Sequence, residues 1–66
     1  MKDLVQAEIH MRQNGVKPIK CTLTPSSVVY LISKYEACWE KLITITTSTG
    51  ARIYLYPKDI CYIIME

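Results

Sequence analysis

The sequence contains very little glycine and histidine, and each shortage excludes a class of site. Gly15 and Gly50 are the only glycines among 66 residues, and each follows polar residues typical of a turn. Two isolated glycines cannot form the glycine-rich loop that holds a nucleotide phosphate. His10 is the only histidine, so imidazole chemistry has one candidate position. The sequence therefore predicts no cofactor and gives little support for an enzyme.

The cysteines are few and far apart in the sequence, at Cys21, Cys38 and Cys61. Zinc sites usually draw their ligands from closely spaced pairs, so we expect no metal site. The odd number does not indicate a disulfide framework, and the first residues lack the apolar segment of a secretory signal. The longest apolar run, residues 60–65, is far too short to cross a bilayer. These features predict a cytoplasmic protein with reduced thiols and no membrane association.

The charge and the length are also modest. Eight Lys and Arg residues against six Asp and Glu residues leave a net charge of +2, and the basic residues are scattered. Nucleic-acid-binding domains usually carry a basic stripe, so the charge permits an anionic partner without indicating one. A chain of 66 residues forms one small domain, residues 1–66, with a limited core. Because disulfides and metals are disfavoured, self-association is the remaining way to reinforce that core.

The first of two predicted β-hairpins lies around Gln13-Asn14-Gly15. Residues 5–11 and 19–23 alternate apolar and polar side chains, which is the period of a half-buried strand. A two-residue loop at Asn14-Gly15 would mix apolar and polar residues on each face, because directly opposed residues point to the same side. A three-residue loop closed by Gly15 separates them. It predicts these pairs: Val5–Leu23, Ala7–Cys21 and Ile9–Ile19 on one face, and Glu8–Lys20 on the other.

The second predicted hairpin has Ser48-Thr49-Gly50 as its loop. The same three-residue turn again sorts the side chains by polarity. It predicts Ile45–Ile53 and Ile43–Leu55 on the buried face, with Thr46–Arg52, Thr44–Tyr54 and Leu42–Tyr56 on the other. A shift of one residue would mix these sets. The agreement between turn chemistry and polarity in both hairpins is the strongest structural signal in the sequence.

A helix is predicted between the hairpins. Thr24 is a good N-cap, and Pro25 suits the first helical position because its missing N–H is not needed there. Apolar residues then recur at helical spacing: Val28, Leu31, Ile32, Tyr35, Cys38, Trp39 and Leu42. We expect this stripe, Tyr35 and Trp39 included, to pack against the sheet. No glycine ends the helix, so we expect the chain to pass almost directly into a strand at Ile43.

A final strand is predicted over residues 60–65, after a break at Pro57-Lys58-Asp59. The strand is apolar on both sides, which predicts a place in the middle of a sheet or beneath a partner. The element order is therefore β-β-α-β-β-β. We predict an α+β fold, a small antiparallel sheet with one helix packed on one face. In this register His10 lies on the polar side and Cys21 on the buried side, which separates a histidine base from a cysteine nucleophile.

The stretch from Ile43 to Ile64 carries a "strand, Gly turn, strand, Asp-Ile-x-Tyr-Ile" pattern. In this respect it resembles the opening of some bacterial response-regulator DNA-binding domains. The resemblance covers about a third of the chain and transfers no residue roles.

The face turned away from the helix is the predicted interaction surface. Its candidate partner-binding residues are Arg52, Tyr54, Tyr56, Lys58 and Tyr62. Tyr and Arg are frequent interface hot spots, so we predict a non-enzymatic protein-binding module of inhibitor or adaptor type. We also predict that it forms a homodimer, through the uncovered face or through the last strand. Domains of this size often come from phages or mobile elements, which is an association only. The alternative is a nucleic-acid-binding regulator that stacks bases on the same residues. An ordinary solvated strand also contains Tyr and Thr, so a plain surface stays open.

Overall fold

The computed structural model describes residues 3–66 and has an α+β fold, as predicted. Its elements, in chain order, are β1 (Val5–Met11), β2 (Ile19–Leu23), α1 (Pro25–Glu36), β3 (Ile43–Thr46), β4 (Arg52–Leu55), the short 3-10 helix η1 (Pro57–Asp59) and β5 (Ile60–Met65). The strands form two antiparallel sheets, β2-β1-β5 and β3-β4, where the sequence predicted one. An isolated bridge between Leu23 and Thr47 connects the end of β2 to the end of β3.

The β1–β2 register is the predicted one, with Ala7 opposite Cys21 and Ile9 opposite Ile19. The tight turn, however, is not formed: pairing with β2 stops at Ile9, whereas on the other edge of β1 the pairing with β5 continues as far as Met11 and Ile60. The backbone N–H of Arg12 donates to the carbonyl of Asp59 at 2.8 Å, so the last residue of η1, directly before β5, holds the end of β1. Residues 12–18 therefore form a wider loop, although Gly15 still has a positive φ of 82°.

The β3–β4 hairpin matches its prediction in both register and turn. Ile43 lies opposite Leu55 and Ile45 opposite Ile53. The turn is closed by two hydrogen bonds: Thr47 N–H to the Ala51 carbonyl at 2.8 Å, and Gly50 N–H to the Thr47 carbonyl at 3.0 Å. Gly50 has a φ of 89°, which glycine adopts without the strain of a side chain.

Helix α1 begins as predicted, because the Thr24 hydroxyl accepts the Ser27 N–H and Pro25 follows it. It ends earlier than the apolar stripe, and Cys38 takes a positive φ of 50°. Cys38 N–H donates to the Tyr35 carbonyl and Trp39 N–H to the Lys34 carbonyl, both at 3.1 Å, which together form a Schellman motif. The expectation that the stripe stays helical beyond Glu36 was therefore wrong.

This helix end turns the last apolar residues of the stripe toward solvent. Trp39 is 39% exposed, Leu42 is 50% exposed, and Cys38 is also exposed. The prediction that Trp39 packs in the core was wrong, because a left-handed residue at the end of the helix changes the direction of the chain. Only Leu31 of the helix is fully buried.

Strand β5 lies at the edge of its sheet. The sequence predicted a place in the middle of a sheet or beneath a partner, and the first of these alternatives was wrong. The neighbouring strand β1 takes the central place because it pairs with β2 on one side and β5 on the other. A bulge between His10 and Met11 shifts the β1–β5 register, leaving Cys61 without an opposite residue.

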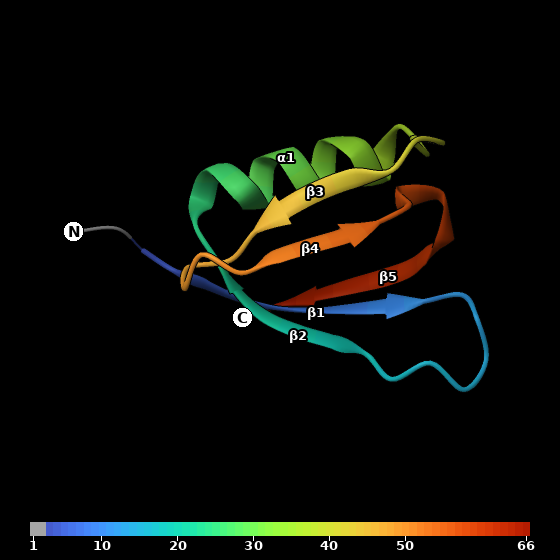
Figure 1. Ribbon diagram of the computed structural model, residues 1–66, viewed down its shortest axis with the longest axis horizontal. Helices are drawn as coiled ribbons and strands as arrows, with labels where there is room; N and C mark the ends of the chain where they lie inside the picture. Colours follow the sequence, from blue (N-terminus) through green and yellow to red (C-terminus); the bar gives the residue numbers. More distant parts are fainter. Residues whose placement is uncertain (1–2) are drawn as a thin grey trace.

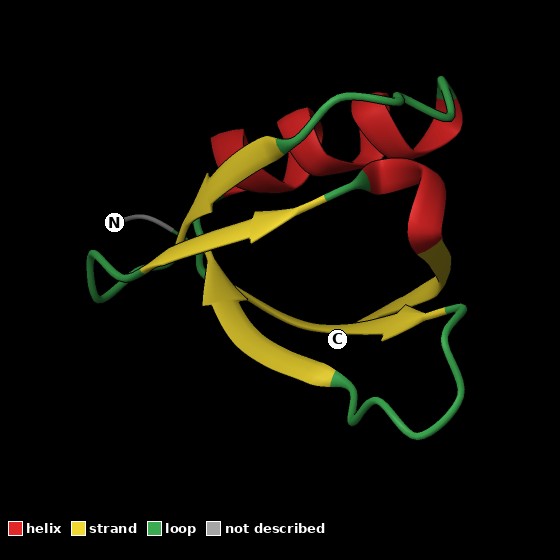
Figure 2. Ribbon diagram, turned by 45° about the vertical axis from the view of Figure 1, so that its right-hand side comes forward, coloured by secondary structure: helices red, strands yellow, loops and turns green. Residues whose placement is uncertain are grey.

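One hydrophobic core lies between the two sheets and α1. Figure 1 shows α1 alongside β3, and Figure 2 shows the two sheets on different sides of the molecule. The buried core residues are Ala7, Ile9, Leu23, Leu31, Ile43, Ile45, Leu55 and Ile60. Both hairpins, the helix and β5 contribute residues to this core. The core residues of the two hairpins lie on the faces that the sequence predicted to be buried. Within residues 3–66, no helix has the length and apolar character needed to span a membrane.

Candidate functional site

The outward side of the β3–β4 hairpin carries most of the predicted partner-binding residues. Arg52 and Tyr54 are exposed on β4, while Leu55 between Tyr54 and Tyr56 is buried. This alternation follows from the strand period, which sends successive side chains to opposite faces. Tyr54 is 58% exposed, the largest value among these residues that the structure gives, so its ring is available for contact.

Tyr56 and Lys58 extend the same surface beyond the end of β4. Tyr56 precedes η1 and is 44% exposed, and the Lys58 Nζ lies 6.0 Å from the centre of its ring. That distance is at the limit of a cation–π contact. Pro57 between them is buried, and the Lys58 N–H donates to the Trp39 carbonyl at 3.2 Å. The backbone is therefore fixed while both side chains face solvent. We call Arg52, Tyr54, Tyr56 and Lys58 the β4 surface.

Tyr62 lies on the other sheet, on the outward side of β5. Its ring stacks on His10 of β1, with centroids 4.2 Å apart and an interplanar angle of 14°. The His10 Nε2 also lies 2.6 Å from the Glu8 Oε1. The structure thus groups four of the five predicted residues around β4 and η1, and places Tyr62 in a separate cluster with Glu8 and His10.

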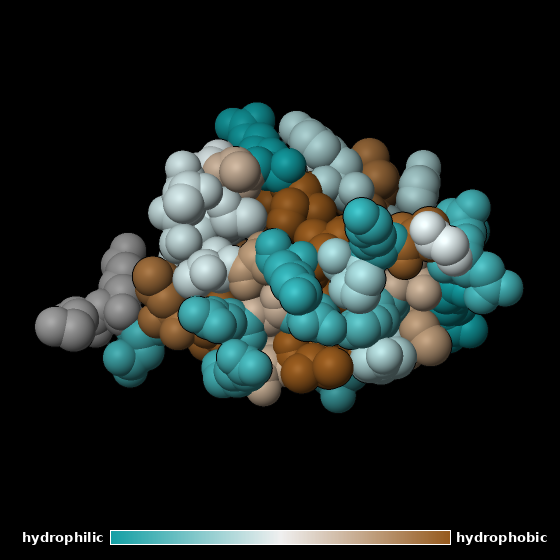
Figure 3. All heavy atoms as spheres, turned by 90° about the horizontal axis from the view of Figure 1, so that it is seen from below, coloured by the Kyte–Doolittle hydropathy of each residue, from teal (hydrophilic) through white to brown (hydrophobic). Residues whose placement is uncertain are grey.

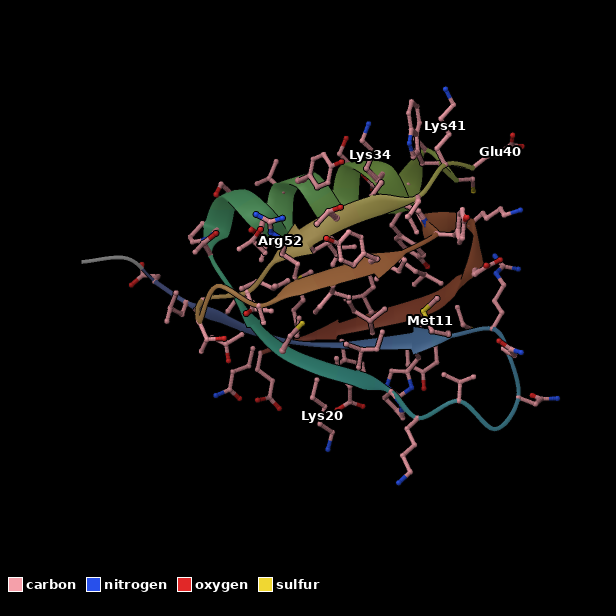
Figure 4. All side chains as sticks on the ribbon, viewed as in Figure 1. Met11, Lys20, Lys34, Glu40, Lys41 and Arg52 are labelled. Carbon is pink, nitrogen blue, oxygen red and sulfur yellow. The ribbon has the colours of Figure 1, made fainter. Side chains whose placement is uncertain are left out.

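The outward side of the three-stranded sheet is mixed in polarity. A shallow hollow there is lined by residues of all three strands: Gln6, Ala7, Glu8, Lys20, Cys21, Thr22, Ile64 and Glu66. Figure 3, seen from below, shows mainly hydrophilic side chains interrupted by separate apolar patches. Figure 4 shows Lys20 pointing away from β2 into solvent. The hollow thus combines one amine, two carboxylates and apolar atoms.

The thiol of Cys21 is not prepared for nucleophilic chemistry. Burial raises its pKa above the ordinary value of 9.0, which favours the protonated thiol. His10 is engaged by Glu8 and Tyr62, whereas Cys21 pairs with Ala7, whose side chain is buried. In residues 3–66, no three His, Cys, Asp or Glu side chains lie close enough to hold a metal ion.

An aromatic and basic cluster at the end of α1 was not predicted from the sequence. The Lys34 Nζ lies 3.8 Å from the Trp39 ring centre and 5.6 Å from that of Tyr30. Figure 4 shows Lys34 projecting from the helix, with Lys41 and Glu40 farther along, past the end of the helix. Tyr30 and Lys34 are four residues apart, which is a recognisable helical spacing. Trp39 joins them only because the helix ends in the Schellman motif, which no glycine marks.

Comparison of the chain with protein-family models, curated proteins and solved structures finds no match.

Proposed function

We propose that this chain is a non-enzymatic protein-binding module of inhibitor or adaptor type, which contacts its partner through the β4 surface. The observation that carries the proposal is the outward placement of Arg52, Tyr54, Tyr56 and Lys58 on one continuous segment with a fixed backbone. Tyr and Arg contribute large contact areas and are enriched among interface hot spots. Such a segment acts by covering a partner's surface, which requires no reactive group.

Self-association is a second part of the proposal. A domain of 66 residues has a small core, and the three cysteines of this one are free. Strand β5 is an edge strand, and Tyr62 and Ile64 on it are 47% and 45% exposed. Apolar edge strands are normally covered, so a partner at β5 would remove an aggregation hazard. Free thiols favour a reducing compartment, which supports the cytoplasm as the location.

The test of the β4 surface is affinity capture with matched variants of the full chain. The immobilised protein, Tyr54→Ala and Arg52→Ala are compared with Lys17→Ala, an exposed position in the 12–18 loop. We expect a protein partner to be retained by the wild type and by Lys17→Ala. The Tyr54→Ala and Arg52→Ala variants each lack a hot-spot side chain, so each is expected to bind the partner about tenfold more weakly, or weaker still.

Two results would contradict this proposal. The first is a partner that binds Tyr54→Ala as tightly as the wild type. The second is tight binding of a single-stranded oligonucleotide that weakens steeply with salt and with Arg52→Ala, since that dependence marks phosphate contacts. The second result would assign the β4 surface to nucleic acid.

A further inference from the structure

The sheet edges of this molecule are protected to different degrees. At β2, the Thr22 carbonyl accepts the Ser48 N–H at 2.8 Å, so the β3–β4 turn covers the edge. At β3, the Thr46 carbonyl accepts the Ser27 hydroxyl at 3.2 Å. At the start of β5, the Tyr35 hydroxyl donates to the Cys61 carbonyl at 3.1 Å. Side chains and turns of the same molecule thus satisfy outward carbonyls on three of its strands.

The rest of β5 presents main-chain groups with no partner strand. Glu66 N–H donates to the Gln6 carbonyl at 3.0 Å, so Glu66 directs its main chain toward β1. In an antiparallel pair this direction alternates from residue to residue. Ile64 and Tyr62 therefore also direct their main chains toward β1, whereas Ile63 and Met65 direct theirs outward. Among residues 3–66, no strand other than β1 pairs with β5, so the structure shows no strand on this side of it.

The side chains beside this edge offer no protection against pairing. Protected edge strands usually carry a charged residue or a proline. Strand β4 has Arg52, but residues 60–65 contain neither a charge nor a proline. Ile64 is 45% exposed although it is one of the most apolar residue types. The edge of β5 thus favours association with another strand.

We propose that a second copy of this chain pairs with β5 in antiparallel fashion, about a twofold axis at Ile64. Ile63 of one copy would then exchange main-chain hydrogen bonds with Met65 of the other copy. Met65 of the first copy would do the same with Ile63 of the second. Ile64 would face its own counterpart in the closely spaced non-hydrogen-bonded pair, and Tyr62 would face Glu66. This inference rests on the self-association proposed above and not on the β4 surface.

The twofold register has a physical basis in the residues that flank it. An axis at Ile63 would pair Cys61 with Met65, but the Tyr35 hydroxyl already occupies the Cys61 carbonyl. The axis at Ile64 leaves that bond intact and places no like charges opposite each other. It also continues the inward face across the axis, because Ile63 and Met65 both pack against the core. The result is a six-stranded sheet with β5 and its copy at the centre.

Two experiments on the full chain test this inference. In sedimentation equilibrium at micromolar concentration, we expect a dimer for the wild type and for Val16→Lys, an exposed apolar position in the 12–18 loop. We expect Ile64→Lys to weaken the dimer by about tenfold or more, because the axis would bring two ammonium groups together. Thermal unfolding confirms that each variant is folded.

Disulfide trapping tests the register itself. In a Cys38→Ser, Cys61→Ser background, Ile64→Cys is expected to cross-link far faster under mild oxidation than Val29→Cys, which is 69% exposed on α1. Equal cross-linking rates, or a dimer unaffected by Ile64→Lys, would overturn the β5 pairing while leaving self-association through another surface. A wild type that is strictly monomeric at these concentrations would overturn both.

Discussion

The β3–β4 hairpin closes in a three-residue turn, whereas the β1–β2 hairpin opens into a wider connection over residues 12–18. Both contain a glycine with positive φ at the equivalent place, Gly50 and Gly15. The two hairpins also differ in the strands beside them. The turn of the second hairpin is tied to β2 by the Leu23–Thr47 bridge and by the Ser48 N–H, which donates to the Thr22 carbonyl. In the first hairpin, β5 pairs with the other edge of β1 as far as Met11, and the Arg12 N–H donates to the Asp59 carbonyl. The β1–β2 register is thus kept without the tight turn, so the alternation of apolar and polar side chains is enough to set it.

The largest expected effect comes from core residues that represent the two hairpins. Ile9 of β1 and Ile45 of β3 are 0% and 1% exposed and belong to one cluster. Replacing either with alanine is expected to lower the free energy of unfolding by about 2–5 kcal/mol, measured by chemical denaturation. A small loss for Ile45→Ala beside a large loss for Ile9→Ala would show that the second hairpin does not share the core.

A smaller effect is expected at the two turn glycines. No atom lies within 4 Å of a Cβ added to Gly50 or Gly15, so an alanine there costs backbone strain alone. Gly50→Ala is expected to destabilise the protein by about 1–2 kcal/mol, since the closed turn fixes its left-handed conformation. Gly15→Ala is expected to cost less, because the wider loop can relax. If thermal or chemical unfolding showed that the two variants lose the same free energy of unfolding, the difference between the turns would be contradicted.

The smallest effect concerns Cys21 on the inward face of the β1–β2 hairpin. Its pKa is raised in the folded state by burial, so the thiol binds its proton more tightly folded than unfolded. The resulting stability is present below the ordinary thiol pKa of 9.0 and is lost as pH rises through the folded pKa. The stability of Cys21→Ala should therefore fall less than that of the wild type when pH is raised through this range.

Alkylation kinetics at mildly alkaline pH give an independent measure of the same residue. Cys38 and Cys61 are exposed, so both should react faster than Cys21. Peptide mapping after a short exposure to iodoacetamide identifies the modified thiols. Modification of Cys21 at the same rate as Cys61 would show that the inward face of the first hairpin is open to solvent.

The sequence predicted much of the hairpin structure because strand alternation and turn residues are local signals. The pairs Ile9–Ile19 and Ile45–Ile53 follow from polarity and from the glycine position. The edge position of β5 is not local, since it depends on which strand occupies the other side of β1. The end of α1 was also not predictable, because Cys38 adopts a conformation for which glycine is the usual signal.

The candidate site was predicted in the same uneven way. Arg52 and Tyr54 follow from the β4 alternation, and Tyr56 and Lys58 are close to it in sequence. Tyr62 could not be assigned to a surface until the pairing of β5 with β1 was known, because that pairing places it on His10. The Lys34–Trp39 contact depends on the turn that follows the helix. Helical periodicity alone therefore placed Trp39 against the sheet, whereas its side chain is exposed.

The pairing of β1 with β5 also has a consequence for the order in which the chain folds. Ala7 and Met65 lie opposite each other although almost the whole described chain separates them. Contacts between such distant residues form more slowly than the local β3–β4 pairing, so we expect β1 to gain its second partner strand after the β3–β4 hairpin has formed.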